Sequence, residues 1–441
     1  MEETLERDGW SAERWGSWQE ERLAALLHRA ATRVPYYRER WRARRRAGDR
    51  APWDRLENWP LLDKSALRAD PAAFVADDRD RRLMFHEHTS GTTGTPLSLW
   101  FSRATLRRAY AILEARWRRW NGVSRHHRWA SLGGQLVTPA AQREPPFWVW
   151  NPALRQLYMS SYHLAPELAE HYFAALRRHR VGYLWGYTSS LYALARAALD
   201  GGRRDLAMAV VLTNAEPVAP HQRAAIAEAF QCPVRETYSL AEAVAGAAEC
   251  GHGRLHLWPE FGVAEVLAGG APVGAGETGE LVATGLLNAD MPLVRYQTGD
   301  RAALAAAAPP CPCGRPLPIL AAVEGRQDDV LITPDGRQIG RLDPVFKADL
   351  PLREAQIVQE ARDRLRVRYV PAAGYTAATG RTLIARLRER MGDVEVTLEE
   401  VPEVPRTAAG KFRAVVSALP AEERLAGPLA DRGRSGRRAE P

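Results

Sequence analysis

The chain has 441 residues, a hydrophobic share of 46%, a charged share of 26% and a formal net charge of +8 at pH 7. This length exceeds one ordinary hydrophobic core, so we expect a soluble globular protein of two or three domains. The longest apolar runs, such as 302–308 and 317–323, are too short for a membrane span, and the acidic first residues do not resemble a signal peptide. The composition therefore favours a cytoplasmic protein without membrane insertion.

The positive charge is concentrated in arginine-rich runs at 42–46 and 432–438. No helix-turn-helix, zinc-finger or aromatic-basic RNA-binding pattern accompanies these runs. We therefore expect solvated helix faces and a flexible tail there, and no nucleic-acid partner.

Apolar spacing predicts the elements of the first half in chain order. Helices are expected over 12–46, with an interruption at Pro35, and over 104–120. Between residues 164 and 212 the pattern alternates, with helices at 167–179 and 190–199 and strands at 181–185 and 207–212. Strands that alternate with helices indicate an α/β sheet.

The second half changes character after Glu260. Strands at 263–267 and 279–284, separated by glycine-rich turns, predict a β-meander or small barrel. A compact α+β segment follows, with strands at 329–333, 356–360, 364–370 and 394–398 and a helix over 376–391. The predicted fold class is thus α/β, with a large N-terminal domain carrying a β-rich subdomain (1–325), a small mobile α+β C-terminal domain (326–418) and a disordered tail (419–441).

One polar loop near residue 90 is suited to phosphate binding. It combines glycines with hydroxyl side chains, in the order Thr89, Ser90, Gly91, Thr92, Thr93 and Gly94. Glycines let the backbone approach an anion closely, and hydroxyls can donate to phosphate oxygens. The loop lacks the Gly-Lys-Ser/Thr ending of a P-loop, which argues against a Walker-type NTPase. A polar surface turn is the alternative interpretation.

Five further motifs follow this loop in the chain: Asn214–Pro217, Tyr238–Glu242, Arg295–Asp300, Gly325–Asp329 and Pro405–Lys411. The whole series closely resembles the adenylate-forming superfamily of acyl-CoA synthetases. The Ala-Glu-Pro run at 215–217, Val-Pro-Tyr-Tyr at 34–37 and Cys-Pro-Cys-Gly-Arg at 311–315 are most similar to the phenylacetate-CoA ligase branch and its CapK-like relatives. The resemblance covers nearly the whole chain.

The resemblance implies an AMP-forming acid-CoA ligase, with an aryl acid as the simplest substrate. A carboxylate attacks the α-phosphate of ATP, pyrophosphate leaves, and the acyl-adenylate passes its acyl group to a thiol. ATP, Mg²⁺ and CoA are the implied cofactors, and a carboxylic acid is the partner. An amine, hydroxyl or carrier-protein acceptor stays open, as do a homodimer and a non-catalytic ATP-binding relative.

The resemblance also assigns roles to residues. It gives ATP or AMP binding to the loop of 89–94 and to Asn214, Ala215, Glu216, Tyr238, Ser239, Asp300 and Arg326; catalysis to Lys411 and the Mg²⁺ carboxylate Glu242; a hinge to Asp328; and an acyl pocket to Trp185, Gly186, Tyr187 and Thr188. In these roles Tyr238 stacks on adenine, Asp300 accepts the ribose hydroxyls and Lys411 faces the α-phosphate. The simpler alternatives are a surface lysine, a turn aspartate, a helix-starting glutamate and a charged linker.

The chain also departs from the superfamily pattern. Ser239 and Ala241 replace a glycine and a threonine of the usual Tyr-Gly-x-Thr-Glu motif, and Leu97 stands where many members carry lysine. These departures favour the non-catalytic alternative, whereas the presence of Lys411, Asp300, Arg326 and Glu242 favours an enzyme.

Three of the four cysteines and one histidine form a candidate metal set. Cys250, His256, Cys311 and Cys313 offer the ligands of a closed structural Zn²⁺ site, and the resemblance suggests a metal in this region. His252 is an alternative imidazole. Reduced, partly buried thiols without a metal are the other interpretation, which also suits Cys232.

Overall fold

The computed structural model describes residues 1–88, 97–133, 137–138, 142, 144–161, 163–164, 166–306, 309–326, 331–334, 338–339, 345, 350–405, 413–420 and 423. The chain forms two compact units, Met1–Val323 and Glu324–Pro441. In the described part of the chain, no helix combines the length and apolar character that crossing a membrane requires.

The chain opens with three helices: α1 (Glu2–Arg7), α2 (Ala12–Arg33) and α3 (Pro35–Arg46). The Ser11 hydroxyl caps α2 by accepting from the backbone N–H of Arg14 at 3.3 Å. Pro35 opens α3, since the first helical position needs no N–H donor. The predicted helix over 12–46, broken at Pro35, is confirmed.

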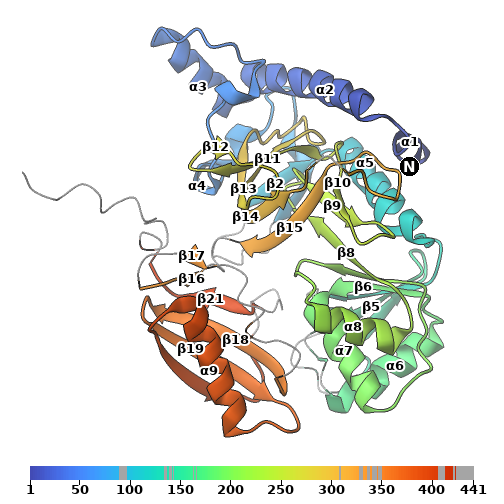
Figure 1. Cartoon of the computed structure of the whole chain (residues 1–441). Coiled ribbons are helices and arrows are strands. Elements are labelled where there is room, and N and C mark those ends of the chain that lie inside the picture. Colours follow the sequence, from blue (N-terminus) through green and yellow to red (C-terminus); the bar gives the residue numbers. More distant parts are fainter. Residues whose placement is uncertain are drawn as a thin grey trace, which may run out of the picture. The chain divides into compact units, whose positions relative to one another are not determined.

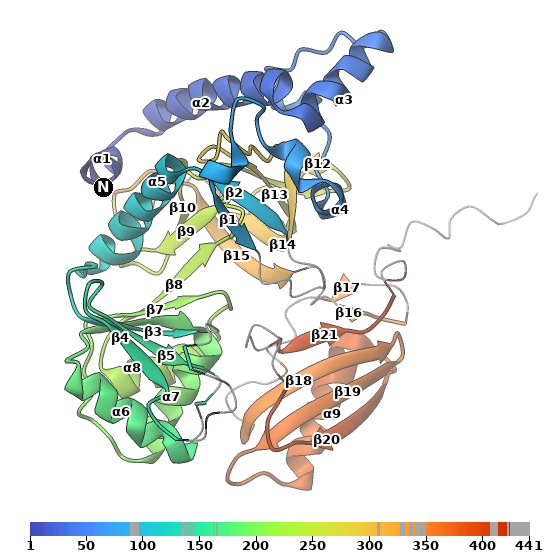
Figure 2. The same ribbon diagram turned by 180° about the vertical axis from the view of Figure 1, so that it is seen from behind.

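A 13-stranded sheet is the centre of the larger unit (Figures 1 and 2). Its spatial order is β12-β11-β13-β14-β15-β10-β9-β8-β7-β6-β3-β5-β4. The strand bounds are β3 (Trp129–Gly133), β4 (Trp148–Asn151), β5 (Gln156–Ser160), β6 (Tyr183–Tyr187), β7 (Val211–Asn214), β8 (Val234–Ser239), β9 (Gly246–Glu249), β10 (Leu255–Leu257), β11 (Gly262–Ala268), β12 (Ala271–Pro272), β13 (Gly279–Gly285), β14 (Tyr296–Leu304) and β15 (Ile319–Arg326). Strands β5, β3, β6, β7 and β8 are mutually parallel, and β4 and β9 flank them in antiparallel pairing.

Three helices cover one face of the parallel strands: α6 (Ala169–Arg178), α7 (Thr188–Asp200) and α8 (Pro220–Phe230). Their apolar side chains share a buried cluster with residues of β3, β5, β6 and β7. The predicted α/β sheet is therefore confirmed. Strand β7 begins later than predicted, because the N–H groups of Met208 and Ala209 bond outside the ladder, to Phe230 at 2.9 Å and Gly182 at 2.7 Å.

The predicted β-meander after Glu260 is also confirmed. Strands β11, β13 and β14 pair antiparallel in succession and extend the main sheet instead of closing as a small barrel. This unit also contains a hairpin of β1 (Phe85–His88) and β2 (Ser98–Phe101), the helix α4 (Lys64–Ala69), and short 3₁₀ turns at Leu56–Asn58, Pro71–Phe74, Arg81–Leu83 and Pro166–Leu168.

The helix predicted over 104–120 is found, with an irregular end. Helix α5 (Arg103–Leu113) continues as a π-helical turn, Glu114–Arg118, and a 3₁₀ turn, Arg119–Asn121. The π turn contains Arg116, which is fully buried. Its two terminal nitrogens donate to the Glu260 carboxylate at 2.6 and 2.9 Å, and Asp8 accepts from its Nε at 3.3 Å. These carboxylates compensate a buried charge that would otherwise be costly.

The second unit is a four-stranded sheet with one helix. Its order is β20 (Glu395–Glu400), β19 (Arg364–Pro371), β18 (Leu352–Ala361) and β21 (Val415–Ser417), and helix α9 (Ala377–Met391) packs Leu383 and Leu387 against Ile357 and Val367. A short pair, β16 (Leu331–Ile332) and β17 (Gln338–Ile339), precedes it. The predicted α+β pattern of this segment is confirmed.

Gly186 permits the close approach of β6 and β3. A Cβ at this position would lie 2.2 Å from the carbonyl oxygen of Leu132. We expect Gly186→Ala to destabilise the larger unit by at least about 1–3 kcal/mol. The added methyl group would clash with a backbone carbonyl, which cannot turn aside as a flexible side chain can. Thermal unfolding followed by circular dichroism measures this. Gly133→Ala is the matched control, since its Cβ would meet only Tyr187 Cζ at 4.0 Å; equal losses for both variants would contradict the prediction.

The buried ion pair gives a second prediction. Arg116→Met removes both hydrogen bonds to the buried Glu260 carboxylate, leaving only Arg7 at 4.0 Å, and should cost about 3–5 kcal/mol. Chemical denaturation of both proteins gives the difference. Arg196→Met breaks an exposed pair with Asp200 and should cost less than about 1 kcal/mol. A small loss in both variants would show that Arg116 is dispensable.

Candidate functional site

The predicted adenine and acyl motifs meet at one edge of the sheet. The parallel strands β6, β7 and β8 end at Tyr187, Asn214 and Ser239, so their carboxyl ends lie side by side. In open α/β sheets, ligands bind beyond the carboxyl ends of the strands. The structure therefore brings Trp185–Thr188, Asn214–Glu216 and Tyr238 to an edge suited to a ligand.

A hydrogen bond joins the Tyr238–Glu242 and Arg295–Asp300 motifs. Tyr238 Oη donates to Asp300 Oδ2 at 2.7 Å, across 62 residues of sequence. Three strands separate β8 from β14 in the sheet order, so the sheet must bend strongly for these side chains to meet. Asp300 is buried, and its backbone N–H donates to the Thr298 hydroxyl at 3.1 Å.

A second contact joins the same two motifs. Tyr296 Oη donates to Glu242 Oε1 at 2.6 Å, and both side chains are buried. The predicted magnesium carboxylate and the predicted ribose carboxylate are thus each held by a tyrosine from the other motif. This reciprocal pairing fixes the orientation of both carboxylates.

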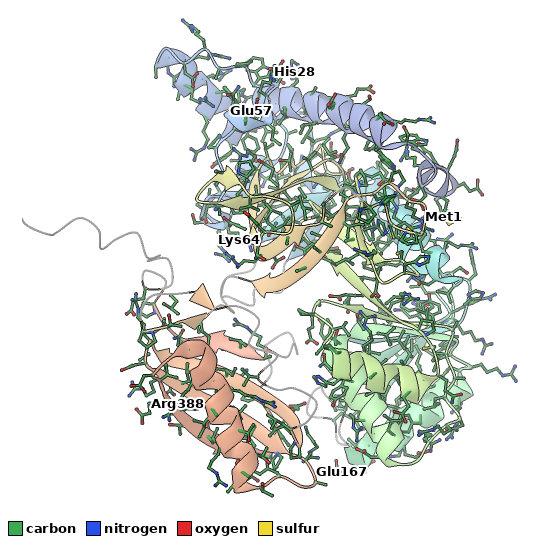
Figure 3. The ribbon with its side chains drawn as sticks, in the orientation of Figure 1. Met1, His28, Glu57, Lys64, Glu167 and Arg388 are labelled. Atoms are coloured by element: carbon green, nitrogen blue, oxygen red, sulfur yellow. The ribbon has the colours of Figure 1, made fainter. Side chains whose placement is uncertain are left out.

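Lys64, which sequence reasoning did not single out, contacts the Arg295–Asp300 motif (Figure 3). It begins α4, where the Asp63 side chain accepts from the Ser65 N–H. Its ammonium donates to the carbonyl of Thr298 and lies 5.7 Å from the ring centroid of Tyr296. The N-cap pattern at Asp63 could have placed the helix, but no local signal connects it to a strand more than two hundred residues later.

The backbone at three motifs adopts an uncommon conformation. Ala215, Ala243 and Arg295 have φ values of 63°, 54° and 48°, and they are three of the six non-glycine residues in the described chain with positive φ. Ala215 and Arg295 lie within predicted motifs, and Ala243 directly follows Glu242. Such conformations are unfavourable for residues with a Cβ and concentrate at functional sites.

The predicted acyl-pocket residues divide between the two faces of β6. Trp185 packs near Trp117 and Trp129, with ring centroids 5.7 and 6.2 Å apart. Gly186 faces the backbone of Leu132, so strand packing already explains the glycine. Thr188 is buried, and its hydroxyl donates to the carbonyl of Glu216 at 3.0 Å, which ties the start of α7 to the adenine motif.

Asn214 carries a buried polar atom with no protein partner. Its Oδ1 accepts no hydrogen bond in the described structure. Buried acceptors are nearly always satisfied in proteins, so an unpaired one at a ligand-binding edge marks a place for a donor from a ligand.

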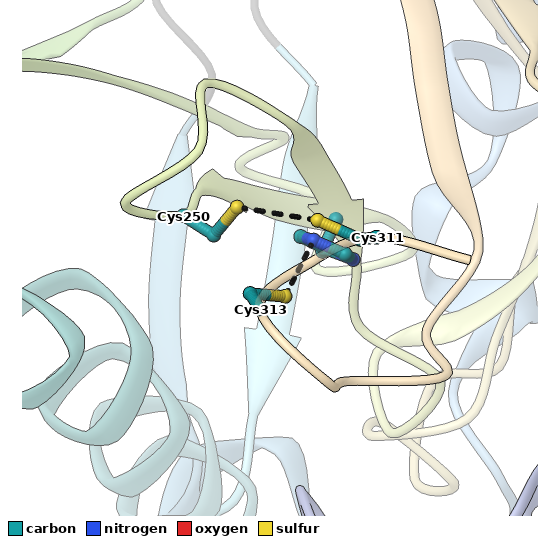
Figure 4. A group of neighbouring side chains, drawn as sticks. Cys250, Cys311 and Cys313 are labelled. Carbon is teal, nitrogen blue, oxygen red and sulfur yellow. Dashed lines mark hydrogen bonds between the residues drawn. The ribbon is translucent and has the colours of Figure 1, made fainter. Parts of the chain in front are cut away.

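The four predicted zinc ligands converge (Figure 4). Their ligand atoms all lie within 4.8 Å of one another. Cys250 Sγ and Cys311 Sγ are 3.7 Å apart, and Cys313 Sγ lies 3.4 Å from His256 Nε2. Around a tetrahedral zinc, two sulfurs are about 3.8 Å apart and a sulfur and an imidazole nitrogen are about 3.6 Å apart. These two spacings are close to the edges of a zinc tetrahedron. His252, the alternative imidazole, is exposed and outside this group.

The surroundings of this cluster orient its histidine and set the charge of its thiols. His256 Nδ1 contacts the Leu317 carbonyl at 3.3 Å, which leaves Nε2 facing the sulfurs. Burial lowers the pKa of His256 and raises the pKa of Cys311 to about 11. A cation is what would stabilise the thiolate here.

Some predicted site residues cannot be located. Thr89–Gly94, Asp328 and Lys411 lie outside the described residues, as does the side chain of Arg326, whose backbone ends β15. Ser239 is exposed at the end of β8, and Leu97 is buried. The roles given to all these residues stay predictions.

The chain is similar in sequence to known proteins. Residues 331–418 match the CapK C-terminal domain family. Protein CapK of Staphylococcus aureus is 25% identical over 283 residues, which are 64% of this chain and 61% of CapK, so the match spans about three fifths of that relative. Phenylacetate-coenzyme A ligase of Thermus thermophilus is 28% identical over 334 residues, 71% of each chain.

A solved structure gives the fold. The crystal structure of 2-hydroxyisobutyryl-CoA ligase in the postadenylation state, in complex with R3-HIB-AMP, superposes with a TM-score of 0.70 at 21% identity, covering 93% of this chain and 91% of that one. The resemblance inferred from the motifs is confirmed at this level: the chain has the fold of the adenylate-forming ligases and carries a CapK-type C-terminal domain.

Proposed function

We propose that this protein activates a carboxylic acid with ATP, through an acyl-adenylate and release of pyrophosphate, and then transfers the acyl group to CoA. The observation that carries this proposal is the pair of tyrosine–carboxylate contacts, Tyr238 with Asp300 and Tyr296 with Glu242, beside the carboxyl ends of β6, β7 and β8. The similarity to a phenylacetate-coenzyme A ligase supports the reaction class.

The nucleotide fits the side of the edge formed by β7 and β8. Adenine offers an exocyclic amine, and Asn214 Oδ1 is a buried acceptor that has no partner among the described residues. Tyr238 would stack on the base. Asp300 would accept ribose hydroxyls, because a carboxylate offers about four acceptor positions in total.

The reaction needs positive charge at the α-phosphate. Attack by the substrate carboxylate builds negative charge on the phosphoryl oxygens, and preorganised donors and cations stabilise it. Lys411 is the proposed cation, and the hydroxyls of the 89–94 loop are the proposed donors. Glu242 would hold Mg²⁺, a hard cation that takes one or two protein carboxylates and screens the triphosphate.

The acceptor is the least constrained part of the proposal. The motif at 333–337, Thr-Pro-Asp-Gly-Arg, differs from the glycine-rich lid turn of acid-CoA ligases. An amine, hydroxyl or carrier-protein thiol therefore stays as the second candidate acceptor. We propose that the acid binds at Trp185–Thr188.

Pyrophosphate exchange tests the first half-reaction without assuming an acceptor. We expect carboxylate-dependent exchange between ATP and labelled pyrophosphate for at least one member of a panel of aryl, fatty and amino acids, with no CoA present. Addition of CoA to the active acid should then release AMP and a thioester. Binding of ATP without exchange for any acid would favour a non-catalytic relative.

Lys411→Ala separates the two half-reactions. The variant should lose exchange by at least about a hundredfold, because the lysine acts on the developing phosphoryl charge. Transfer from a supplied acyl-adenylate to CoA should persist. An equal loss in both half-reactions would show that Lys411 does not have this role.

We also propose that Cys250, His256, Cys311 and Cys313 bind one structural Zn²⁺. The four ligands close the coordination sphere, so the metal would stabilise the fold and take no part in the reaction. It would join the turn between β9 and β10 to the segment that precedes β15.

Cys311→Ser tests the metal. Elemental analysis should find about one zinc per wild-type chain and much less in the variant, whose melting temperature should fall. Cys232→Ser is the matched control, because Cys232 is buried but lies outside the cluster, and it should keep its zinc. A wild-type protein purified without chelators that contains no zinc would contradict this proposal.

A further inference from the structure

A buried serine–histidine pair lies at the same carboxyl edge of the sheet. Ser160 ends β5, and its hydroxyl is 2.8 Å from Nδ1 of His163. Ser160 is fully buried, and His163 is only 6% exposed. None of the sequence motifs includes either residue, and the nucleotide chemistry does not use them.

The protein itself holds the pair in place. The Tyr172 hydroxyl donates to the Ser160 carbonyl at 2.7 Å, and the Ser160 N–H donates to the Phe147 carbonyl at 2.9 Å. The His163 ring stacks on Phe147 with centroids 4.7 Å apart and planes 12° apart. These contacts fix the imidazole without involving its second nitrogen.

That second nitrogen has no partner. His163 Nε2 is buried and makes no hydrogen bond in the described structure. Leaving a buried ring nitrogen unpaired is unfavourable, and such atoms in native proteins call for an explanation. A polar group of a bound molecule would supply one.

Strand register places the pair on the acyl side of the edge. Gly133 of β3 is opposite Ser160, and the preceding residue, Leu132, is opposite Gly186, so Tyr187, Gly133 and Ser160 form a row. Neighbouring strands are about 4.8 Å apart, which puts the ends of this row about 10 Å apart. The middle residue of the row, Gly133, has no side chain. A Cβ added there would lie 4.0 Å from Cζ of the Tyr187 ring.

We propose that His163 is a specificity residue that binds a hydroxyl on the substrate acid, remote from its carboxylate, through Nε2. This inference rests on the proposed function. Ser160 and Nδ1 share one hydrogen, so Nε2 carries either an N–H or a lone pair, and a hydroxyl can pair with both forms. Ser160 acts as a positioning residue.

The test compares acids that differ in one hydroxyl. Pyrophosphate exchange is measured with phenylacetate and 4-hydroxyphenylacetate, and with hexanoate and 6-hydroxyhexanoate. Wild-type protein should prefer a hydroxylated member by at least about tenfold, because a site built around a hydroxyl disfavours the analogue that lacks it. His163→Phe should remove this preference by losing activity on the hydroxylated acid, and His163→Gln should retain part of it.

A matched control separates specificity from folding. His179 also stacks on an aromatic ring, that of Trp150 at 4.7 Å, but it precedes β6 at the opposite edge of the sheet. His179→Phe should leave the preference unchanged. The ratio of two acids does not depend on the fraction of folded protein, so a merely structural role of His163 would not alter it.

The outcomes are distinct. Exchange with a preference that survives in His163→Phe, or a wild-type preference for the unsubstituted acids, overturns the inference and leaves the proposed function intact. Absence of exchange with every acid tested overturns the proposed function, and the inference fails with it.

Discussion

The hydrogen bond between Tyr238 and Asp300 constrains much of the larger unit, because it joins two strands that the sheet order keeps apart. Strand β8 belongs to the parallel part, and β14 to the antiparallel meander. A flat sheet would separate their ends by about 19 Å, since each of the four steps between them is about 4.8 Å. The bend brings two carboxylates, Asp300 and Glu242, to the edge where the parallel strands end. The meeting of these two motifs thus depends on sheet curvature as much as on the residues themselves.

Charged contacts surround the cysteine cluster, which lies beside the segment between β14 and β15. Arg315 follows the cysteine pair closely, lies 4.2 Å from the Trp120 ring centroid and faces Asp8 at 3.6 Å. Asp8 also binds Arg116, and the ring centroids of Trp120 and His256 are 6.1 Å apart. The proposed zinc ligands, the buried ion pair and the segment after α1 therefore form one contiguous group. A metal there would stabilise both the meander and the attachment of the N-terminal helices.

The sequence predicted the parts of this protein that repeat a local period. Helices such as α2 and α9 and the alternation of α6, β6 and α7 follow directly from apolar spacing, because burial of one face imposes that spacing. The cysteine cluster was predictable too, since few side chains bind zinc and four of them lie in two short segments. Lys64 was not, because its contact with Thr298 depends on the tertiary fold and has no local signal. The start of β7 was misplaced for a related reason: Met208 and Ala209 are apolar enough for a strand, but their hydrogen bonds go to Phe230 and Gly182.

The two halves of the candidate site are recognisable by different kinds of evidence. The proposed nucleotide side consists of short motifs in a fixed order, because the phosphates and ribose of a nucleotide demand the same donors and acceptors each time. The proposed acyl side has no such motif, because acids differ in size and shape. Its residues are connected by register instead: Tyr187, Gly133 and Ser160 belong to different segments and become neighbours only when β6, β3 and β5 pair. A histidine such as His163, three residues after a strand end, can therefore escape sequence reasoning and still lie beside the row that we propose to contact the acid.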